Sequence, residues 1–234
     1  MNNYKVDAVP HIICGGFTRE ETENALIDLN FLGIDNVLLL RGDSEKHESH
    51  FTPEPGGHAY ALDLVEQVVN MNSGTFLDDD LKGVEPTKFC IGVAGYPEKH
   101  FEAPNLNTDI SFLKKKVDAG AQYIVTQMFY DNQKYFDFVN KCRQVGINVP
   151  IIPGLKPIST KKQTAILPKT FFIDIPDDLI QEIEKCKSDD AVKQAGIDWA
   201  VTQAKELIKF GVPCLHFYTM GSPENIRKIA SQLF

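Results

Sequence analysis

The stretch "VLLLRGD", residues 37–43, decides the fold of this chain. Residues 37–40 form an unbroken apolar run, which is typical of a strand buried on both faces of a parallel sheet. The polarity then changes at once, because residues 41–43 are Arg, Gly and Asp. In parallel α/β architectures, ligands bind beyond the carboxyl ends of the strands. The stretch therefore predicts a buried strand that delivers polar groups to a binding site.

The same alternation of strand and helix recurs along the chain. Apolar or β-branched runs predict strands at 8–14, 36–40, 89–95, 123–130, 149–154 and 213–219, each followed by a segment of helical periodicity. Thr18 and Glu21 have the spacing of a capping box, and Ser222 followed by Pro223 is typical of a helix start. Six such units favour parallel strands, either in an open doubly wound sheet or in a (β/α) barrel. A closed barrel of this kind has eight strands, so the chain falls two units short.

The composition is that of a globular protein. The chain has 234 residues, of which 43% are hydrophobic and 24% charged, and we expect a single domain. Its net charge of −8 opposes binding to nucleic acid or to an anionic membrane surface. No segment is apolar for long enough to cross a bilayer, and residues 1–10 lack the order of a secretory signal. We therefore expect a cytoplasmic protein.

The cysteines and histidines form no recognisable metal motif. The five cysteines are odd in number, and none belongs to a C-x-x-C pair. Cys14, Cys90 and Cys214 lie in apolar runs, where a thiol usually packs as a small hydrophobic group. His47 and His50 lack the i, i+4 spacing that places two ligands on one helical face. We therefore predict core packing for these three cysteines and no zinc site.

Polar or aromatic residues follow every predicted strand, and each has a structural alternative. Arg41 and Asp43 suit a local ion pair as well as a ligand site. His11 and His216 lie within apolar runs and suit the core more often than a site. Gln127 costs free energy if it is buried unpaired, so it should bond to the backbone or face a ligand.

The motifs narrow the reaction only by exclusion. The chain has no G-x-G-x-x-G, no Walker loop and no G-x-S-x-G elbow, which removes common signatures of nucleotide-binding proteins and hydrolases. A Schiff-base lyase requires a lysine at a strand end, for which Lys156 is the near candidate. The residues alone therefore favour a small-molecule enzyme on a parallel α/β scaffold, with its reaction unspecified.

Six collinear motifs resemble one family. They are "PHIIC", "LLLRGD", "YPEKHFEA", "KKKVDAGAQYIVTQMFYD", "IIPGLKPIS" and "LHFYT". In this order and spacing they resemble the flavin-dependent methylenetetrahydrofolate reductases. The resemblance implies an α/β fold of the TIM-type (β/α)8 barrel family, in which residues 1–234 form a single, N-terminally short barrel domain of about six βα units. It also implies FAD as cofactor and NADH or NADPH as co-substrate, in the reduction of 5,10-methylenetetrahydrofolate to 5-methyltetrahydrofolate for one-carbon metabolism and methionine biosynthesis.

Matching the motifs position by position implies the site residues. Asp43 and Gln127 would be the catalytic pair, and together with Gln163 they would bind the folate. The flavin would contact His11, Arg41, Gly42, Asp43, Tyr60, Ala61, Tyr96, His100, Ala103, Asp109, Lys115 and Lys116. Of these, Lys115 and Lys116 would offset the pyrophosphate charge. Exchange of electron donor and acceptor through one shared pocket predicts ping-pong kinetics.

The sequence also departs from the family pattern. Members carry two further strand-helix units before the "PHIIC" strand, and the first of them bears a glutamate that protonates the folate. Residues 220–222 stand where many relatives have an arginine, and Phe112 replaces a polar residue. We therefore expect a fragment or shortened product that binds FAD poorly and turns over slowly, with a noncatalytic flavin- or folate-binding barrel as the alternative. The expected partners are the folate substrate and further copies of the chain, in a homo-oligomer.

Overall fold

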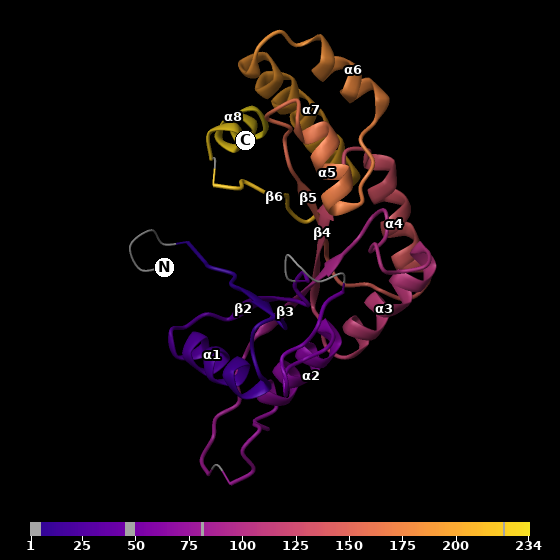
Figure 1. Cartoon of the computed structure of the whole chain (residues 1–234). Coiled ribbons are helices and arrows are strands. Elements are labelled where there is room, and N and C mark those ends of the chain that lie inside the picture. The colour runs from indigo at the N-terminus through magenta and orange to yellow at the C-terminus, as the bar shows by residue number, and fades with distance from the viewer. Residues whose placement is uncertain (1–5, 45–49, 81, 222) are drawn as a thin grey trace. The chain divides into compact units, whose positions relative to one another are not determined.

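A computed structural model describes residues 6–44, 50–80, 82–221 and 223–234. Figure 1 labels its strands and helices along the chain. The chain forms two compact units, which we call unit 1 (Met1–Ala94 and Leu113–Ile124) and unit 2 (Gly95–Phe112 and Val125–Phe234). The expectation of a single barrel domain stays a prediction.

The strands form a parallel sheet whose order follows the order of the chain. They are β1 (His11–Ile13), β2 (Asn36–Leu40), β3 (Cys90–Gly95), β4 (Tyr123–Met128), β5 (Ile151–Leu155) and β6 (His216–Phe217). Their order in the sheet is β1-β2-β3-β4-β5-β6, with parallel pairing of β1 to β2, β2 to β3, and β5 to β6. A doubly wound sheet reverses its strand order at a switch point, whereas this order does not reverse. The structure therefore confirms the α/β barrel-type fold with six strand-helix units and excludes the doubly wound alternative.

Helices follow the strands, as the periodicity predicts. They are α1 (Arg19–Phe31), α2 (Ala61–Asn72), α3 (Leu106–Asp118), α4 (Asn132–Gln144), α5 (Gln163–Phe171), α6 (Asp177–Lys185), α7 (Asp189–Phe210) and α8 (Pro223–Leu233). The capping box of α1 is confirmed, since the Glu21 N–H donates to Thr18 Oγ1 at 3.2 Å and the Thr18 N–H donates to Glu21 Oε2 at 2.8 Å. α8 begins at Pro223 as predicted, and the expected N-cap Ser222 lies outside the described residues, as does His47.

β2 lies at the centre of the unit 1 core. Val37 and Leu39 have no exposed surface, and neither has Leu64 on α2. Tyr123, at the start of β4, lies across Gly92 of β3, where an added Cβ would come within 2.1 Å of the tyrosine ring. The Tyr123 hydroxyl donates a hydrogen bond to Val37 O at 2.9 Å. The prediction that residues 37–40 form a buried strand is therefore confirmed.

β1 differs from β2, although both carry apolar residues. His11 and Ile13 are exposed, and Ile13 keeps 38% of its surface accessible. β1 pairs with β2 along one side, and in the described part of unit 1 no strand pairs with its other side. A strand at a sheet edge lacks a neighbour to cover it. The interpretation of His11 as a core residue is therefore wrong.

Two apolar clusters contribute to the core of unit 2. One includes Met128 of β4, Ile158 after β5, and residues of α6 and α7. The other joins α7 to α8 through Ile197 and Ile229. Gly196 allows α7 to pack directly on the chain that follows β5, because an added Cβ would lie 1.9 Å from Ile158 O. This close approach holds the segment after β5 against α7.

The prediction for the cysteines is confirmed only in part. Cys14 keeps 1% of its surface exposed and Cys90 is partly buried, but Cys214 is exposed. The prediction for Cys214 is wrong because β6 contains only His216–Phe217, so Cys214 lies in the loop before that strand.

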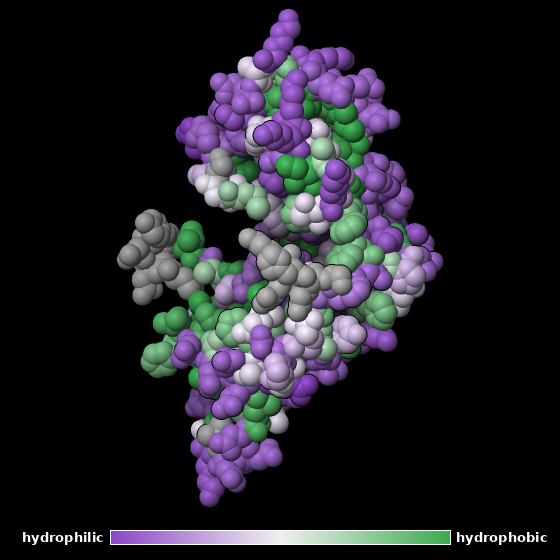
Figure 2. Space-filling view, viewed as in Figure 1, coloured by the Kyte–Doolittle hydropathy of each residue, from purple (hydrophilic) through white to green (hydrophobic). Residues whose placement is uncertain are grey.

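Hydrophilic residues dominate the face of the molecule shown in Figure 2, and apolar residues are scattered among them. Exposed apolar residues of this kind are normal on protein surfaces. Every helix in the described part of the chain is too short or too polar to cross a lipid bilayer.

Candidate functional site

The ends of β1 and β2 lie side by side in unit 1. The Cys14 N–H donates to both Leu40 O and Arg41 O, each at 3.1 Å. Gly42 adopts a φ of 89°, which favours glycine, and an added Cβ would contact Ile13 at 3.5 Å. The chain therefore turns tightly at Arg41 and Gly42, with the main chain close to the end of β1.

The turn presents two side chains of opposite charge. The Arg41 guanidinium lies over the Phe51 ring, 5.2 Å from the ring centroid. A cation on an aromatic face is held there by about 0.5–1 kcal/mol when the pair is accessible to water. Asp43 is exposed two residues further on. Unit 1 therefore offers a positioned cation and a carboxylate at the end of β2.

Three further predicted flavin residues lie on β1 and at the start of α2 in unit 1. His11 is exposed on β1, and Ala61 is the first residue of α2. Tyr60, which precedes α2, is 63% exposed, and its N–H donates to Asp63 Oδ2 at 3.0 Å. This capping bond fixes the Tyr60 backbone while its ring stays accessible.

The two predicted pyrophosphate lysines lie in the last turn of α3. Lys116 Nζ donates a hydrogen bond to Ala94 O of β3 at 3.1 Å. Lys115 precedes it on the same turn. The structure thus places one of the two ammonium groups beside the carboxyl half of β3.

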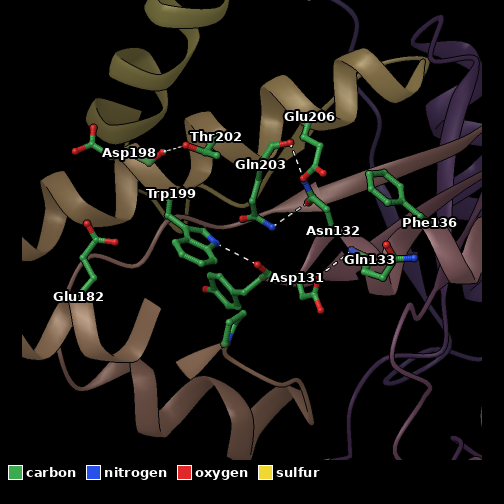
Figure 3. Close-up of a pocket in the computed structure, with 12 residues that line it drawn as sticks. Asp131, Asn132, Gln133, Phe136, Glu182, Asp198, Trp199, Thr202, Gln203 and Glu206 are labelled. Carbon is green, nitrogen blue, oxygen red and sulfur yellow. Dashed lines mark hydrogen bonds between the residues drawn. The ribbon is translucent and has the colours of Figure 1, made fainter. Parts of the chain in front are cut away.

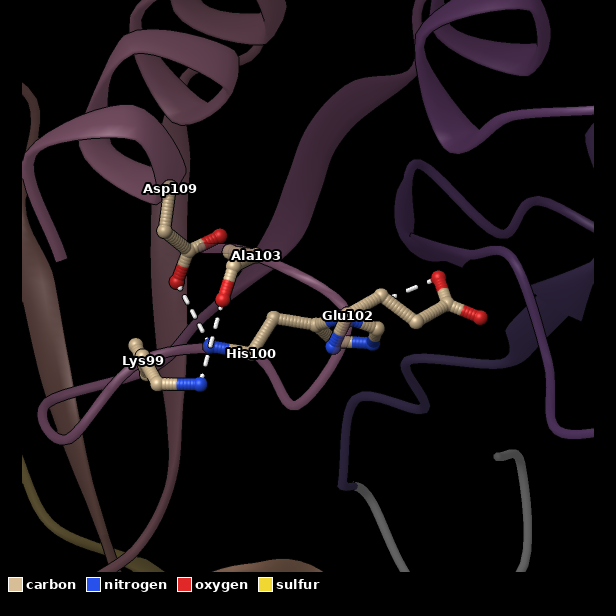
Figure 4. A network of polar contacts seen from close by, with 5 residues as sticks. All are labelled: Lys99, His100, Glu102, Ala103 and Asp109. Atoms are coloured by element: carbon tan, nitrogen blue, oxygen red, sulfur yellow. Dashed lines mark hydrogen bonds and ion pairs between the residues drawn. The ribbon is translucent and has the colours of Figure 1, made fainter. Parts of the chain in front are cut away.

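Four predicted flavin residues of unit 2 come together after β3, and Figure 4 shows three of them. The His100 N–H donates to Asp109 Oδ2 at 2.8 Å, and the Ala103 N–H donates to His100 O at 3.0 Å. The Tyr96 and His100 rings meet edge to face, with their centroids 4.8 Å apart. Lys99 adopts a φ of 99°, and its Nζ donates to Ala103 O at 3.1 Å. Strained backbone of this kind persists only where surrounding contacts hold it, so residues 96–103 form a fixed segment.

Glu98 ties this segment to the chain that follows α5. Its Oε2 accepts the Asp174 N–H at 3.0 Å, and the Asp174 carboxylate pairs with Lys134 Nζ at 3.3 Å. The Phe101 and Phe172 rings stack nearby with their centroids 4.8 Å apart. Burial raises the pKa of Glu98 to about 7, although the hydrogen bond from the Asp174 N–H acts in the opposite direction. This carboxyl group therefore titrates near neutral pH.

The two predicted substrate amides are held by main-chain groups. Gln127 Oε1 accepts the Met128 N–H at 2.9 Å. Gln163 Oε1 accepts the Ser159 N–H at 2.6 Å and the Thr160 N–H at 3.3 Å. These bonds assign the oxygen and nitrogen of each amide. Since each carbonyl oxygen bonds to the backbone, each NH2 group is the part that can donate to a ligand.

Tyr218 and Lys156 mark the carboxyl ends of β6 and β5. The Tyr218 N–H donates to Leu155 O at 2.9 Å, and its hydroxyl crosses Gly154 to donate to Thr126 O at 2.8 Å. Lys156 is only 8% exposed. The sequence singles out Lys156 solely as a Schiff-base candidate, and no pattern in it indicates that this lysine is buried.

A groove of unit 2 lies elsewhere, between α4, α6 and α7 (Figure 3). It has a volume of about 650 Å³, and none of the residues that line it is a predicted site residue. Asn132 Nδ2 donates to Glu206 Oε2 at 2.6 Å, and Trp199 Nε1 donates to Tyr130 O at 3.1 Å. These bonds join α7 to α4 and to the chain just before α4, so we assign these polar groups a structural role.

A family model for methylenetetrahydrofolate reductase matches residues 1–234. The chain is 40% identical over 226 residues to methylenetetrahydrofolate reductase (NADH) 1 of Arabidopsis thaliana. This alignment covers 92% of this chain and 36% of the plant protein. It is 34% identical over 220 residues to 5,10-methylenetetrahydrofolate reductase of Salmonella typhimurium. That alignment covers 94% of this chain and 67% of the bacterial protein. The chain thus spans about a third of the length of the plant relative and about two thirds of the bacterial one.

Solved structures share the fold at low sequence identity. An uncharacterized protein from Clostridium thermocellum, which binds two copies of 5-methyl-5,6,7,8-tetrahydrofolic acid, matches with a TM-score of 0.60 and 18% identity. The match covers 99% of this chain and 73% of that protein. At this level of identity the likeness establishes the fold alone.

Proposed function

Because the chain belongs to the methylenetetrahydrofolate reductase family, we propose that it carries flavin- and folate-binding elements of an FAD-dependent reductase. The proposed reaction reduces 5,10-methylenetetrahydrofolate to 5-methyltetrahydrofolate with NADH or NADPH, in one-carbon metabolism and methionine biosynthesis. The observation that carries the proposal is the family match over residues 1–234. Relatives are named for NADH in Arabidopsis thaliana and for NADPH in Caenorhabditis elegans, so either coenzyme is consistent with the family.

The chemistry of the unit 1 residues fits the anionic part of FAD. Arg41, Lys115 and Lys116 are cations at strand and helix ends, where a pyrophosphate would find charged donors. Gly42, with its φ of 89°, would let the main chain approach the cofactor closely. His11, Tyr60 and Ala61 would add contacts from β1 and from the start of α2.

In unit 2 the fixed segment after β3 would bind the flavin. Tyr96, His100, Ala103 and Asp109 are joined by the contacts described above, so this segment needs little rearrangement to receive a ligand. When bound, FAD would supply the hydride chemistry that amino-acid side chains cannot perform.

Asp43 and Gln127 would act on the reacting groups. The NH2 group of Gln127 would donate first to the carbonyl of the nicotinamide and then to a pterin acceptor, because its oxygen already accepts the Met128 N–H. Gln163 would donate to the folate in the same manner. The Asp43 carboxylate would contact the pterin and influence the flavin by its charge.

An anaerobic titration with FAD tests the proposal. The visible spectrum of bound flavin should bleach on addition of NADH or NADPH and recover on addition of 5,10-methylenetetrahydrofolate. A spectral shift on binding without bleaching would instead identify the noncatalytic flavin-binding alternative. If FAD produces no spectral change at saturating concentration, the proposal is wrong.

Substitution of Asp43 tests its role within that reaction. Asp43→Asn should change the flavin potential and slow folate reduction on the order of ten-fold or more, because a charge near the reacting groups is lost. The matched control is Asp28→Asn, which removes an exposed carboxylate from α1 and should change neither quantity. Unchanged potential and rate in Asp43→Asn would remove this residue from the site.

We further propose that the protein is cytoplasmic and forms a homo-oligomer. Unit 1 exposes large apolar side chains, including Ile13 at 38% on its edge strand and Phe31 at 89% at the end of α1. Sedimentation equilibrium over a range of protein concentrations tests the assembly, and a single species at the monomer mass would contradict it.

A further inference from the structure

Buried charges in proteins are normally paired, because an unpaired ionised group loses its hydration without compensation. Among the described residues, the carboxylates and cationic side chains less than a tenth exposed are Glu23, at 7%, and Lys156, at 8%. Glu23 follows the rule, since both of its carboxylate oxygens accept the Leu77 N–H, at 3.2 and 3.0 Å. In the part of the chain that the structure describes, no hydrogen bond or ion pair reaches the Lys156 ammonium. Lys156 has a largely buried side chain and no partner among the described residues, and its ammonium is not one of the fully buried polar atoms that lack a partner, so the tip of the side chain stays accessible to a ligand.

The position of Lys156 in the sheet is that of a site residue. It directly follows β5, and parallel α/β proteins bind ligands at the carboxyl ends of their strands. Gln163 begins α5 on the same segment of chain after β5, and its Oε1 accepts the N–H groups of Ser159 and Thr160. Lys156 therefore lies on the loop that also carries a proposed substrate amide.

The pairing of β5 with β6 indicates which face of the sheet Lys156 occupies. Gly154 pairs with His216, and the Tyr218 N–H bond to Leu155 O continues this register past the strand ends. Since side chains alternate along a strand, Lys156 shares a face with Gly154, His216 and Tyr218. Phe217 on the opposite face packs against the cluster of α7 and α8. The Lys156 side chain thus leaves the sheet on the side away from those two helices.

We propose that Lys156 is an anion-binding residue of this strand end, and that its ammonium contacts a carboxylate or phosphate oxygen of the ligand. The identity of that ligand rests on the proposed function. Folate carries carboxylates on its glutamate, whereas FAD and NAD(P)H carry a pyrophosphate, so the same chemistry has two sources. A bound oxyanion would supply the partner that the described residues do not provide, in a charge-assisted hydrogen bond.

The electrostatics of the site agree with this role. Burial lowers the pKa of Lys156 below its ordinary value, and a bound anion would act in the opposite direction by favouring the charged ammonium. The chain as a whole has a net charge of −8, so general attraction does not account for binding of an anion. Affinity for an oxyanion would have to come from a local cation such as Lys156.

Inorganic pyrophosphate tests the inference without reference to any cofactor. Lys156→Met keeps a side chain of similar length and removes the charge, and Lys169→Met is the matched control because Lys169 is exposed on α5. Pyrophosphate binding, measured by isothermal titration on the full chain, should weaken at least ten-fold in Lys156→Met and remain unchanged in Lys169→Met. Lys156→Arg restores a charge and should restore binding. Equal affinity in Lys156→Met and the unsubstituted protein, or no binding by the latter at millimolar pyrophosphate, would overturn the inference.

The thermal midpoint separates this role from a structural one. Removal of an ammonium that makes no hydrogen bond or ion pair with the described residues should leave the unfolding temperature of Lys156→Met unchanged or higher. A lower unfolding temperature together with full pyrophosphate affinity would assign Lys156 to the fold instead.

Two pairs of ligands then identify the source of the anion. Tetrahydrofolate is compared with tetrahydropteroate, which lacks the glutamate, and FAD is compared with riboflavin, which lacks the phosphates. The Lys156→Met substitution should weaken only the charged member of one pair. If the unsubstituted protein binds none of these four, the proposed function fails, while the pyrophosphate result still decides the role of Lys156.

Discussion

β1 in unit 1 and β5 in unit 2 carry similar apolar residues and yet differ in how well they are covered. Ile13 of β1 keeps 38% of its surface exposed, whereas Leu155 of β5 has none exposed. Within the described residues, β5 has a strand on each side in the sheet order, while β1 has only β2. Two strands of similar composition are therefore buried to different extents because they have different numbers of neighbouring strands in the sheet.

The same difference in burial determines how much hydration a polar or charged side chain loses at the end of each strand. His11 on β1 is exposed and can remain hydrated, so it needs no protein partner. Lys156 after β5 is only 8% exposed, and none of the described residues pairs with its ammonium. A polar group at a buried strand end therefore favours a ligand of complementary charge more strongly than a hydrated group at an exposed strand end does.

The largest expected effect is at the contact between α7 and the chain after β5. Helix propensity alone predicts that Gly196→Ala stabilises the protein by about 1 kcal/mol. We expect the opposite, a loss of about 3 kcal/mol or more, because the new Cβ would lie 1.9 Å from Ile158 O. Urea denaturation followed by the fluorescence of Trp199, the only tryptophan, measures the change in unit 2. Gln194→Ala, at an exposed position of the same helix, should change stability by about 0.5 kcal/mol or less.

Truncation of one side chain on each strand tests the comparison directly. Leu155→Ala should destabilise the protein by about 3 kcal/mol, because it leaves a cavity in a fully buried site. Ile13→Ala should cost about 1 kcal/mol or less, since the side chain is partly hydrated already. Urea denaturation followed by circular dichroism at 222 nm measures both variants. Equal losses would show that β1 is covered in solution, for example by another copy of the chain.

Much of the fold follows from local sequence patterns. Residues 37–40 predict β2 almost to the residue, because an unbroken apolar run between polar residues suits a buried strand. The capping box likewise sets the start of α1. These features depend on residues close together in the chain, which is why the sequence alone reveals them.

Features that depend on distant residues could not be predicted in the same way. The exposure of His11 results from the edge position of β1, and the exposure of Cys214 results from the short β6. The burial of Lys156 depends on packing around the end of β5. The roles expected for the flavin and folate residues follow from the family resemblance and not from local sequence patterns.

Helix caps provide a smaller contrast between the two units. In unit 1, α1 has a reciprocal capping box formed by Thr18 and Glu21. In unit 2, Ser188 caps α7 with one bond, in which its Oγ accepts the Ala191 N–H at 3.2 Å. Thr18→Ala should therefore cost about 1 kcal/mol, and Ser188→Ala about half as much. Hydrogen exchange at the Glu21 and Ala191 amides measures each cap locally, and equal acceleration at the two amides would contradict this ranking.

The smallest expected effect is a pH dependence that belongs to unit 2. The pKa of Glu98 is raised to about 7 in the folded protein, from an ordinary value near 4.5, so the folded state binds more protons than the unfolded state between these values. Stability contributed by this group is therefore fully present below pH 4.5 and is lost as the pH rises to about 7. Because Glu98 is only partly buried, screening by water keeps the change small.

Two substitutions should move this dependence in opposite directions. Glu98→Gln keeps an oxygen for the Asp174 N–H and removes the titration, so it should flatten the slope of stability against pH. Lys134→Met removes the nearby cation that favours the charged carboxylate, so it should raise the pKa of Glu98 further and extend the slope to higher pH. Trp199 fluorescence in urea at a series of pH values measures both. Because Glu98 belongs to unit 2, a change over the same pH range in the protection factor of the Glu21 amide, which removes the intrinsic pH dependence of exchange, would show that the two units do not respond separately.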